Sequence, residues 1–214
     1  MKLPTTQEDV KTLLSYIGVD GLLYEEIFIT DYNTDVDGLY DRLGEYESID
    51  ELNHLATLLE DMTEIDLEIF GAAAVHGDYG GSVKDLINLA QNLDCYDYFP
   101  GVHDNESLGY YLIDSLDFEE IPDRLQNYFD YEAYGRDFDL NENGSFAEGG
   151  YILRNGGDFI EHYSGRNDLP DEHRIFAYPD PPNKMSVKQQ LEMYGSMAQA
   201  HAADRPIPAR EERA

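Results

Sequence analysis

The chain of 214 residues contains one cysteine, Cys95, and no tryptophan. A single cysteine excludes an intramolecular disulfide and a cysteine-based zinc site. No apolar run is long enough to cross a membrane, and residues 1–10 do not have the pattern of a signal peptide. We therefore expect a cytoplasmic protein with no membrane contact.

Basic residues are also scarce. Lys and Arg total 14 against 45 Asp and Glu, which gives a formal net charge of -31. Such a field repels nucleic acid and anionic membranes and attracts proteins with basic grooves, so we expect no direct nucleic acid binding. An apolar content of 42% with 17 Tyr and 9 Phe argues against disorder, because these residues can form a core.

The negative charge is unevenly distributed along the chain. Residues 1–168 carry a net charge of -30, whereas residues 169–214 carry -1. From Thr12 to Asp123 there are 27 carboxylates, with only Arg42 and Lys84 as cations. Because duplex DNA carries one charge per ~1.7 Å, 27 carboxylates match the phosphates of roughly 45 Å of duplex. A halophilic protein would be acidic throughout, which the nearly neutral end does not fit.

Helical periodicity and capping motifs predict most of the helices. Residues 7–17 form one apolar stripe, and Ser48, Thr63 and Ser82 each precede an acid by three residues, as in a capping box. These signals predict helices over 48–62, from 63 towards 74, and over 82–93, with a further helix over 106–116.

The stretch IPDRLQNYFDYEAYGRDFDL, residues 121–140, predicts a short amphipathic helix. Pro122 stands at a natural first helical position and Gly135 near the far end. Leu125, Tyr128, Phe129 and Ala133 recur at helical spacing.

Aromatic and β-branched residues predict strands over 24–32, 96–102, 145–154 and 158–163. Asn155-Gly156 is a hairpin signal joining the last two. Four prolines make residues 168–184 a predicted linker, and residues 186–200 form a candidate helix. The fold class is therefore α+β.

The chain has no motif of a catalytic or metal site. Residues 33–38 and 139–144 begin like calcium loops, but Gly44 and Gly150 replace the glutamate at the twelfth position, so solvated turns are the preferred interpretation. The six histidines lack ligand spacing, and residues 79–82 lack the lysine of a phosphate-binding loop. We expect no catalytic residue, no metal and no cofactor.

Residues 125–140, LQNYFDYEAYGRDFDL, closely resemble a signature near the C-terminus of the ArdA antirestriction proteins. Weaker similarity covers residues 24–55, including ITDY and SIDELN, and the whole resemblance spans about residues 5–165. It implies a DNA mimic that competitively occupies the DNA-binding groove of type I restriction-modification enzymes. It also implies a homodimer and an elongated molecule whose helix-rich middle is flanked by small α/β parts.

The resemblance gives an expected division into four parts: residues 1–48, 49–104, 105–167, and a Pro-rich linker and tail over 168–214. Family chains usually open with a further strand-forming segment that has no counterpart before Met1. We therefore expect a trimmed or rebuilt first part. The tail lies outside the family pattern.

Two sets of residues are candidates for binding. Acids in or beside predicted turns and polar helix faces are expected to stand in for phosphates: Asp35, Asp37, Glu45, Glu47, Glu60, Asp61, Glu64, Asp94, Asp97, Asp104, Asp114, Asp117, Glu119 and Glu120. Aromatic residues beyond the need of one short helix are expected either at the dimer interface or in the monomer core: Tyr128, Phe129, Tyr131 and Tyr134. An acidic adaptor for an unrelated basic host protein and a calcium-dependent module are the alternative functions.

Overall fold

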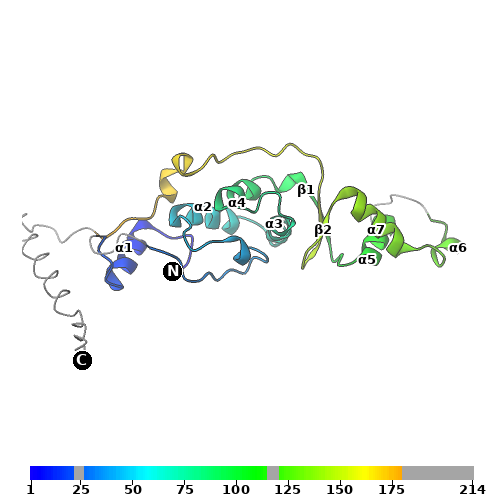
Figure 1. Cartoon of the computed structure of the whole chain (residues 1–214), viewed down its shortest axis with the longest axis horizontal. Helices are drawn as coiled ribbons and strands as arrows, with labels where there is room; N and C mark the ends of the chain where they lie inside the picture. Colours follow the sequence, from blue (N-terminus) through cyan, green and yellow to red (C-terminus); the bar gives the residue numbers. More distant parts are fainter. Residues whose placement is uncertain (22–26, 115–120, 180–214) are drawn as a thin grey trace, which may run out of the picture. The chain divides into compact units, whose positions relative to one another are not determined.

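The computed structural model describes residues 1–21, 27–114 and 121–179 of the chain (Figure 1). It divides into a unit over Met1–Tyr178 and a second over Pro179–Ala214. The described residues form seven α-helices and one three-stranded antiparallel sheet, which confirms the α+β class.

The helices and strands follow one another in a simple order along the chain. The helices are α1 (Gln7–Tyr16), α2 (Ile49–Glu60), α3 (Glu64–His76), α4 (Val83–Ala90), α5 (Asn105–Asp114), α6 (Asp123–Gln126) and α7 (Tyr131–Glu142). The strands are β1 (Tyr96–Pro100), β2 (Ser145–Phe146) and β3 (Gly150–Arg154), in the sheet order β1-β3-β2.

Helices α2, α3 and α4 begin where the capping residues predicted. The side chains of Ser48, Thr63 and Ser82 each accept a hydrogen bond from the backbone N–H three residues later. At Thr63 the box is reciprocal, because Asp66 also accepts from the Thr63 N–H at 3.1 Å. The box predicted at Ser48 is only half formed, since Glu51 bonds elsewhere.

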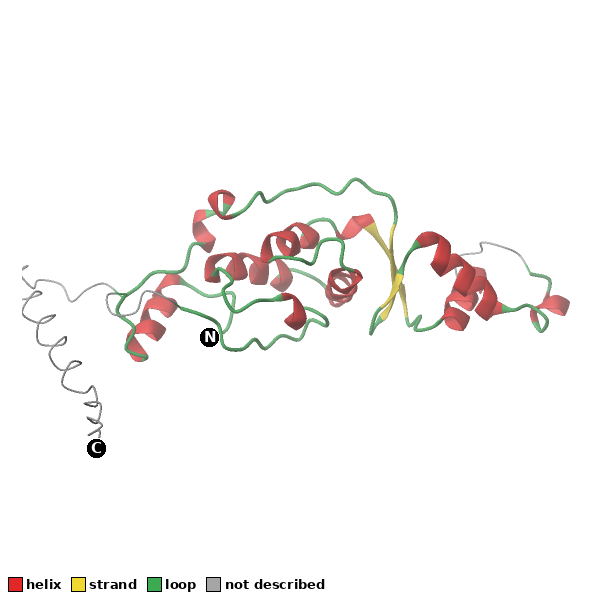
Figure 2. Cartoon of the chain, viewed as in Figure 1, coloured by secondary structure: helices red, strands yellow, loops and turns green. Residues whose placement is uncertain are grey.

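The sheet lies between two apolar clusters. Figure 2 shows it between two groups of helices, α2 to α4 and α5 with α7. Tyr96 and Ile152 pack into the larger cluster, with α2, α3 and α4. Phe99, Tyr151 and Leu153 point to the opposite face and pack with α5 and α7. Successive residues of β1 and β3 therefore alternate between two cores, and both faces of this short sheet are covered.

The single helix predicted over residues 121–140 is wrong. The structure has two helices, α6 and α7, with Pro122 as the residue preceding α6. Gly135 does not end α7 but lies inside it, buried against α5. A Cβ at Gly135 would collide with the backbone carbonyl of Asn105, and a Cβ at Gly109 with that of Tyr131. Gly135 therefore allows a close helix crossing.

The strand predicted over residues 24–32 is not formed where the structure describes it. Residues 27–32 have no regular structure, with one backbone bond of 2.8 Å from the N–H of Ile29 to the carbonyl of Glu45. Residues 22–26 lie outside the described residues.

The hairpin predicted between 145–154 and 158–163 is also wrong. Residues 145–154 themselves fold back as β2 and β3, and β3 pairs on its other side with β1. Residues 158–163 form no strand, because Asn88 of α4 and Asn92, just after α4, bond their backbone instead. Asn92 bonds the N–H and carbonyl of Ile160 at 2.8 and 2.9 Å, and Asn88 bonds those of Tyr163 at 2.9 and 2.8 Å.

The segment leading to residue 178 packs on α1 and α2. Leu169 and Ile175, which lie in the predicted linker, are buried, and Ile175 joins a cluster with Val10 and Leu14 of α1. Asp50 Oδ1 accepts from the backbone N–H groups of Ile175 at 2.9 Å and Phe176 at 2.6 Å. The helix predicted over 186–200 lies outside the described residues.

Candidate functional site

Three basic side chains of the first unit, those of Arg42, Lys84 and Arg154, bond to internal partners. Arg42 donates to the carbonyl of Val75 at 3.2 Å, and Lys84 forms an ion pair with Glu161. Arg154 donates to the hydroxyl of Tyr79 at 3.3 Å, with its guanidinium carbon 5.5 Å from the centre of that ring. These three cations therefore already have partners within the protein.

Among the described acids, Glu51 is the one whose side chain is buried. Its side chain accepts from the hydroxyl of Tyr163 and from Nε of Arg166, each at 2.9 Å. Burial, followed by the hydrogen bond to Glu51, raises the pKa of Tyr163. This acid belongs to the framework of the protein and is not available to a partner.

Most of the predicted acids lie on the surface. Of the fourteen, the structure describes eleven, and ten of these are exposed: Asp35, Asp37, Glu45, Glu60, Asp61, Glu64, Asp94, Asp97, Asp104 and Asp114. Glu47 is half-buried and its Oε1 accepts from the N–H of Gly44 at 3.2 Å. Asp117, Glu119 and Glu120 lie outside the described residues.

The structure brings some of these acids together. Glu60, Asp61 and Glu64 surround the tight connection between α2 and α3. Asp94 and Asp97 flank the start of β1, where Asn155 Nδ2 donates to the Asp94 carbonyl at 2.8 Å and to Asp97 Oδ1 at 3.3 Å. Local structure therefore fixes the backbone that carries these charges.

Asp104 has a structural role in addition to its charge. Its Oδ1 accepts from the backbone N–H of Ser107 at 2.8 Å and from its hydroxyl at 2.7 Å, at the start of α5. These bonds lower the pKa of Asp104, which stays ionised. Asp66, outside the predicted set, behaves alike at α3, where hydrogen bonds from Thr63 lower its pKa.

The four aromatic candidates have different environments. Tyr128 is 86% exposed, whereas Tyr131 is 8% exposed and stacks on Tyr110 with ring centres 3.8 Å apart. Phe129 and Tyr134 are half-buried and meet edge to face at 5.5 Å. The monomer core therefore uses Tyr131, while Tyr128 remains on the surface.

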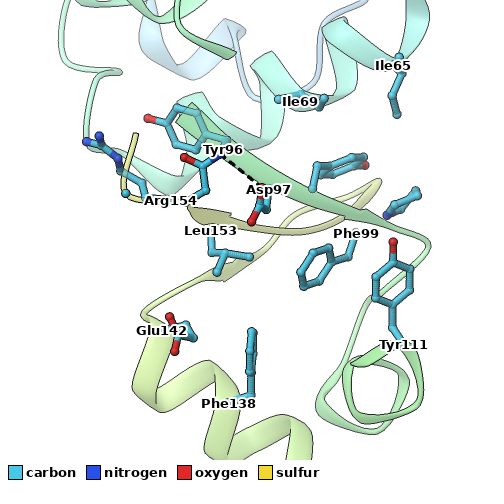
Figure 3. Close-up of a pocket in the computed structure, with 14 residues that line it drawn as sticks. Ile65, Ile69, Tyr96, Asp97, Phe99, Tyr111, Phe138, Glu142, Leu153 and Arg154 are labelled. Carbon is cyan, nitrogen blue, oxygen red and sulfur yellow. Dashed lines mark hydrogen bonds between the residues drawn. The ribbon is translucent and has the colours of Figure 1, made fainter. Parts of the chain in front are cut away.

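An open groove of about 1100 Å³ runs along β1 (Figure 3). Ile65 and Ile69 of α3 line one side, and Tyr111 of α5 and Phe138 of α7 line the other. This groove was not predicted from the sequence. Its only sequence signal is the pair Ile65 and Ile69, four residues apart on a helix face that the core does not fully cover.

No helix in the described ranges is both long and apolar enough to cross a bilayer. Within those ranges, no three His, Cys, Asp or Glu side chains are placed to hold a metal ion together.

The family model for the antirestriction protein ArdA matches residues 1–153. The chain belongs to the ArdA family. The match takes in every predicted acid and all four aromatic candidates, and it leaves residues 154–214 of this ArdA chain outside. The resemblance found in the sequence is thereby confirmed, and with it an antirestriction function. A search of curated proteins gave no match.

Proposed function

We propose that this ArdA-family protein acts in the cytoplasm as a mimic of DNA. In this proposal it competitively occupies the DNA-binding groove of a type I restriction-modification enzyme. Proteins that bind DNA gain much of their affinity from Lys and Arg side chains that meet phosphates. Carboxylates held at similar positions would meet the same cations without presenting bases.

The observation that carries the proposal is the separation of charges in the fold. Ten of the predicted acids are exposed, while Arg42, Lys84 and Arg154 bond to groups of the protein itself. The acids that surround the connection of α2 and α3 and the start of β1 sit on ordered backbone. Binding to a partner therefore does not have to order these acids first, whereas binding by a flexible acidic tail would.

The mechanism is occupancy and requires no chemical step. Each exposed ion pair contributes ~0.2–1 kcal/mol, so binding is expected to be spread over many acids. Affinity should fall steeply with salt, because the charges on both partners recover their counterions when the complex dissociates.

The test is competition on a purified type I enzyme. The protein and a duplex carrying the recognition site are titrated against the enzyme at several salt concentrations, and bound duplex is measured by fluorescence anisotropy. We expect mutual displacement and a steep salt dependence. Simultaneous binding of both, or an affinity that is flat in salt, would contradict mimicry.

The alternative is an acidic adaptor for a basic host protein unrelated to restriction. Its supporting observation is the same exposed charge, so the two proposals differ only in the partner. An adaptor would leave DNA cleavage by the type I enzyme unchanged at concentrations that saturate its own partner.

A further inference from the structure

Strand β1 lies at an edge of the sheet, and no strand of the described residues pairs with its outer side. The N–H of Asn155 donates to the carbonyl of Cys95 at 3.1 Å, and the N–H of Gly101 donates to that of Gly149 at 2.9 Å. These bonds fix which residues face β3. In an antiparallel pair the intervening residues point outward, so Tyr96 and Tyr98 turn their backbone N–H and carbonyl groups away from β3. The Tyr96 N–H already donates to the carbonyl of Leu93, which leaves the Tyr96 carbonyl and the N–H and carbonyl of Tyr98 for an added strand.

The free edge runs along the groove described above. Ile65 is 45% exposed and stands with Ile69 on the side of α3, while Tyr111 and Phe138 lie across the strand (Figure 3). An added strand needs backbone partners on the edge and contacts for side chains that alternate between two faces. The groove provides both.

The charge of the groove selects the kind of segment that fits it. Asp97 and Glu142 line the groove and are exposed, and Glu68 borders it, accepting from the hydroxyl of Tyr98 at 3.2 Å. Arg154 is the one Lys or Arg among the described lining residues, and it is bound to Tyr79 and Gly157. The available charge is therefore negative.

We propose that the outer edge of β1 binds an extended, Lys- or Arg-bearing segment of another protein as a fourth strand. The apolar side chains on one face of that segment pack on Ile65 and Ile69, and its basic side chains, on the opposite face, meet Asp97 and Glu142. The inference goes beyond the proposed function, because it does not require the partner to be a restriction enzyme.

A second copy of this chain fits the edge less well. Antiparallel pairing of two β1 strands about Tyr98 would set Pro100 opposite Tyr96, and proline has no N–H to donate. It would also bring Asp97 and Glu142 of both copies together, which like charges oppose.

The experiment uses the full chain and a short fluorescent peptide of alternating Lys and Val. A peptide of equal length and charge with Pro in place of Val is the control. We expect the Lys-Val peptide to bind by anisotropy and the Pro peptide to bind far more weakly. Residue-resolved hydrogen exchange should show new protection at the Tyr98 amide. The Tyr96 amide, already bonded to the Leu93 carbonyl, and the Asp97 and Phe99 amides, already bonded to β3, should not change.

Variants then test the side-chain contacts. Asp97→Lys with Glu142→Lys should weaken peptide binding roughly tenfold. Glu45→Lys, outside the groove, should change it far less, and thermal unfolding checks that each variant is folded. Three results would overturn the proposal: equal binding of both peptides, unchanged exchange at the Tyr98 amide, or concentration-dependent protection of this amide without peptide. The last would assign the edge to a second copy. The exchange measurement needs no variant.

Discussion

The hydroxyl of Tyr163 donates a hydrogen bond of 2.9 Å to Oε1 of Glu51, although 112 residues separate the two in sequence. Glu51 is 7% exposed, and the second carboxylate oxygen accepts from Arg166 at 2.9 Å. The pair joins the irregular segment after β3 to α2. It also explains why this one acid of an acidic protein lies in the interior.

Removing the Tyr163 hydroxyl should destabilise the protein. Tyr163→Phe leaves an oxygen of the buried carboxylate without this donor, and we expect a loss of about 1.5–3 kcal/mol of unfolding free energy. Tyr96→Phe is the matched control, because the Tyr96 hydroxyl is buried and has no hydrogen-bond partner among the residues that the structure describes. That change should be neutral or stabilising. Urea unfolding measures both, and equal losses would contradict the assignment.

The crossing of α5 and α7 should not tolerate a side chain at Gly135. Gly135→Ala would place Cβ against the Asn105 carbonyl, so the helices must separate. We expect a loss of about 1–3 kcal/mol or more from overpacking. Gly81→Ala is the control, because its Cβ would meet only Asp85 Oδ2 at 3.5 Å. The free energy of unfolding of this control should stay within about 0.5 kcal/mol of that of the parent protein in the same urea assay.

His54 should make stability depend on pH. Burial, and then the nearby His173, lower the pKa of His54. In the unfolded chain this pKa returns to about 6.5, so the unfolded state takes up a proton more readily. The contribution of His54 to the free energy of unfolding is therefore fully present above about pH 6.5. It is lost progressively as the pH falls below that value.

The comparison that isolates His54 is between variants. His54→Leu should show a shallower decline in unfolding free energy below about pH 6.5 than the parent protein. Tyr96→Phe, which adds or removes no group that titrates in this range, should run parallel to the parent. If the profile of His54→Leu also runs parallel to that of the parent protein, His54 is not the source of the pH dependence of stability.

Neutralising acids should weaken target binding gradually. Glu60→Gln, Asp61→Asn and Glu64→Gln together should cost roughly 0.6–3 kcal/mol of binding free energy, with each single change near the detection limit. The competition assay measures this series. Asp104→Asn is unsuitable here because it also removes the cap of α5. One substitution that abolishes binding would indicate a hot-spot interface instead.

Exposed Tyr128 should contribute to dimer formation more than buried Tyr131. Tyr128→Ser should shift association towards monomer in light scattering, with thermal stability unchanged, because the side chain is 86% exposed. Tyr131→Ala should instead destabilise the monomer by roughly 2–5 kcal/mol through loss of core packing. A parent protein that is monomeric at all concentrations tested would remove the dimer proposal.

The sequence by itself determined the features that depend on near neighbours. Ser48, Thr63 and Ser82 begin helices because a capping side chain needs only the backbone three residues ahead. The α+β class, the charge asymmetry and the ArdA resemblance were likewise readable from residue order. The exposure of ten acids followed from the same patterns, since carboxylates are seldom buried without partners.

The tertiary structure decided what depends on residues far apart. Gly135 looks like a helix end in sequence, but α5 makes it the contact point of a helix crossing. Residues 158–163 have the composition of a strand, yet Asn88 and Asn92 satisfy their backbone across 68 to 75 residues of sequence. Among the described residues, β1 likewise has a strand partner on one side only. A backbone group bonds whichever partner the packed chain places beside it, and residue order alone does not specify that partner.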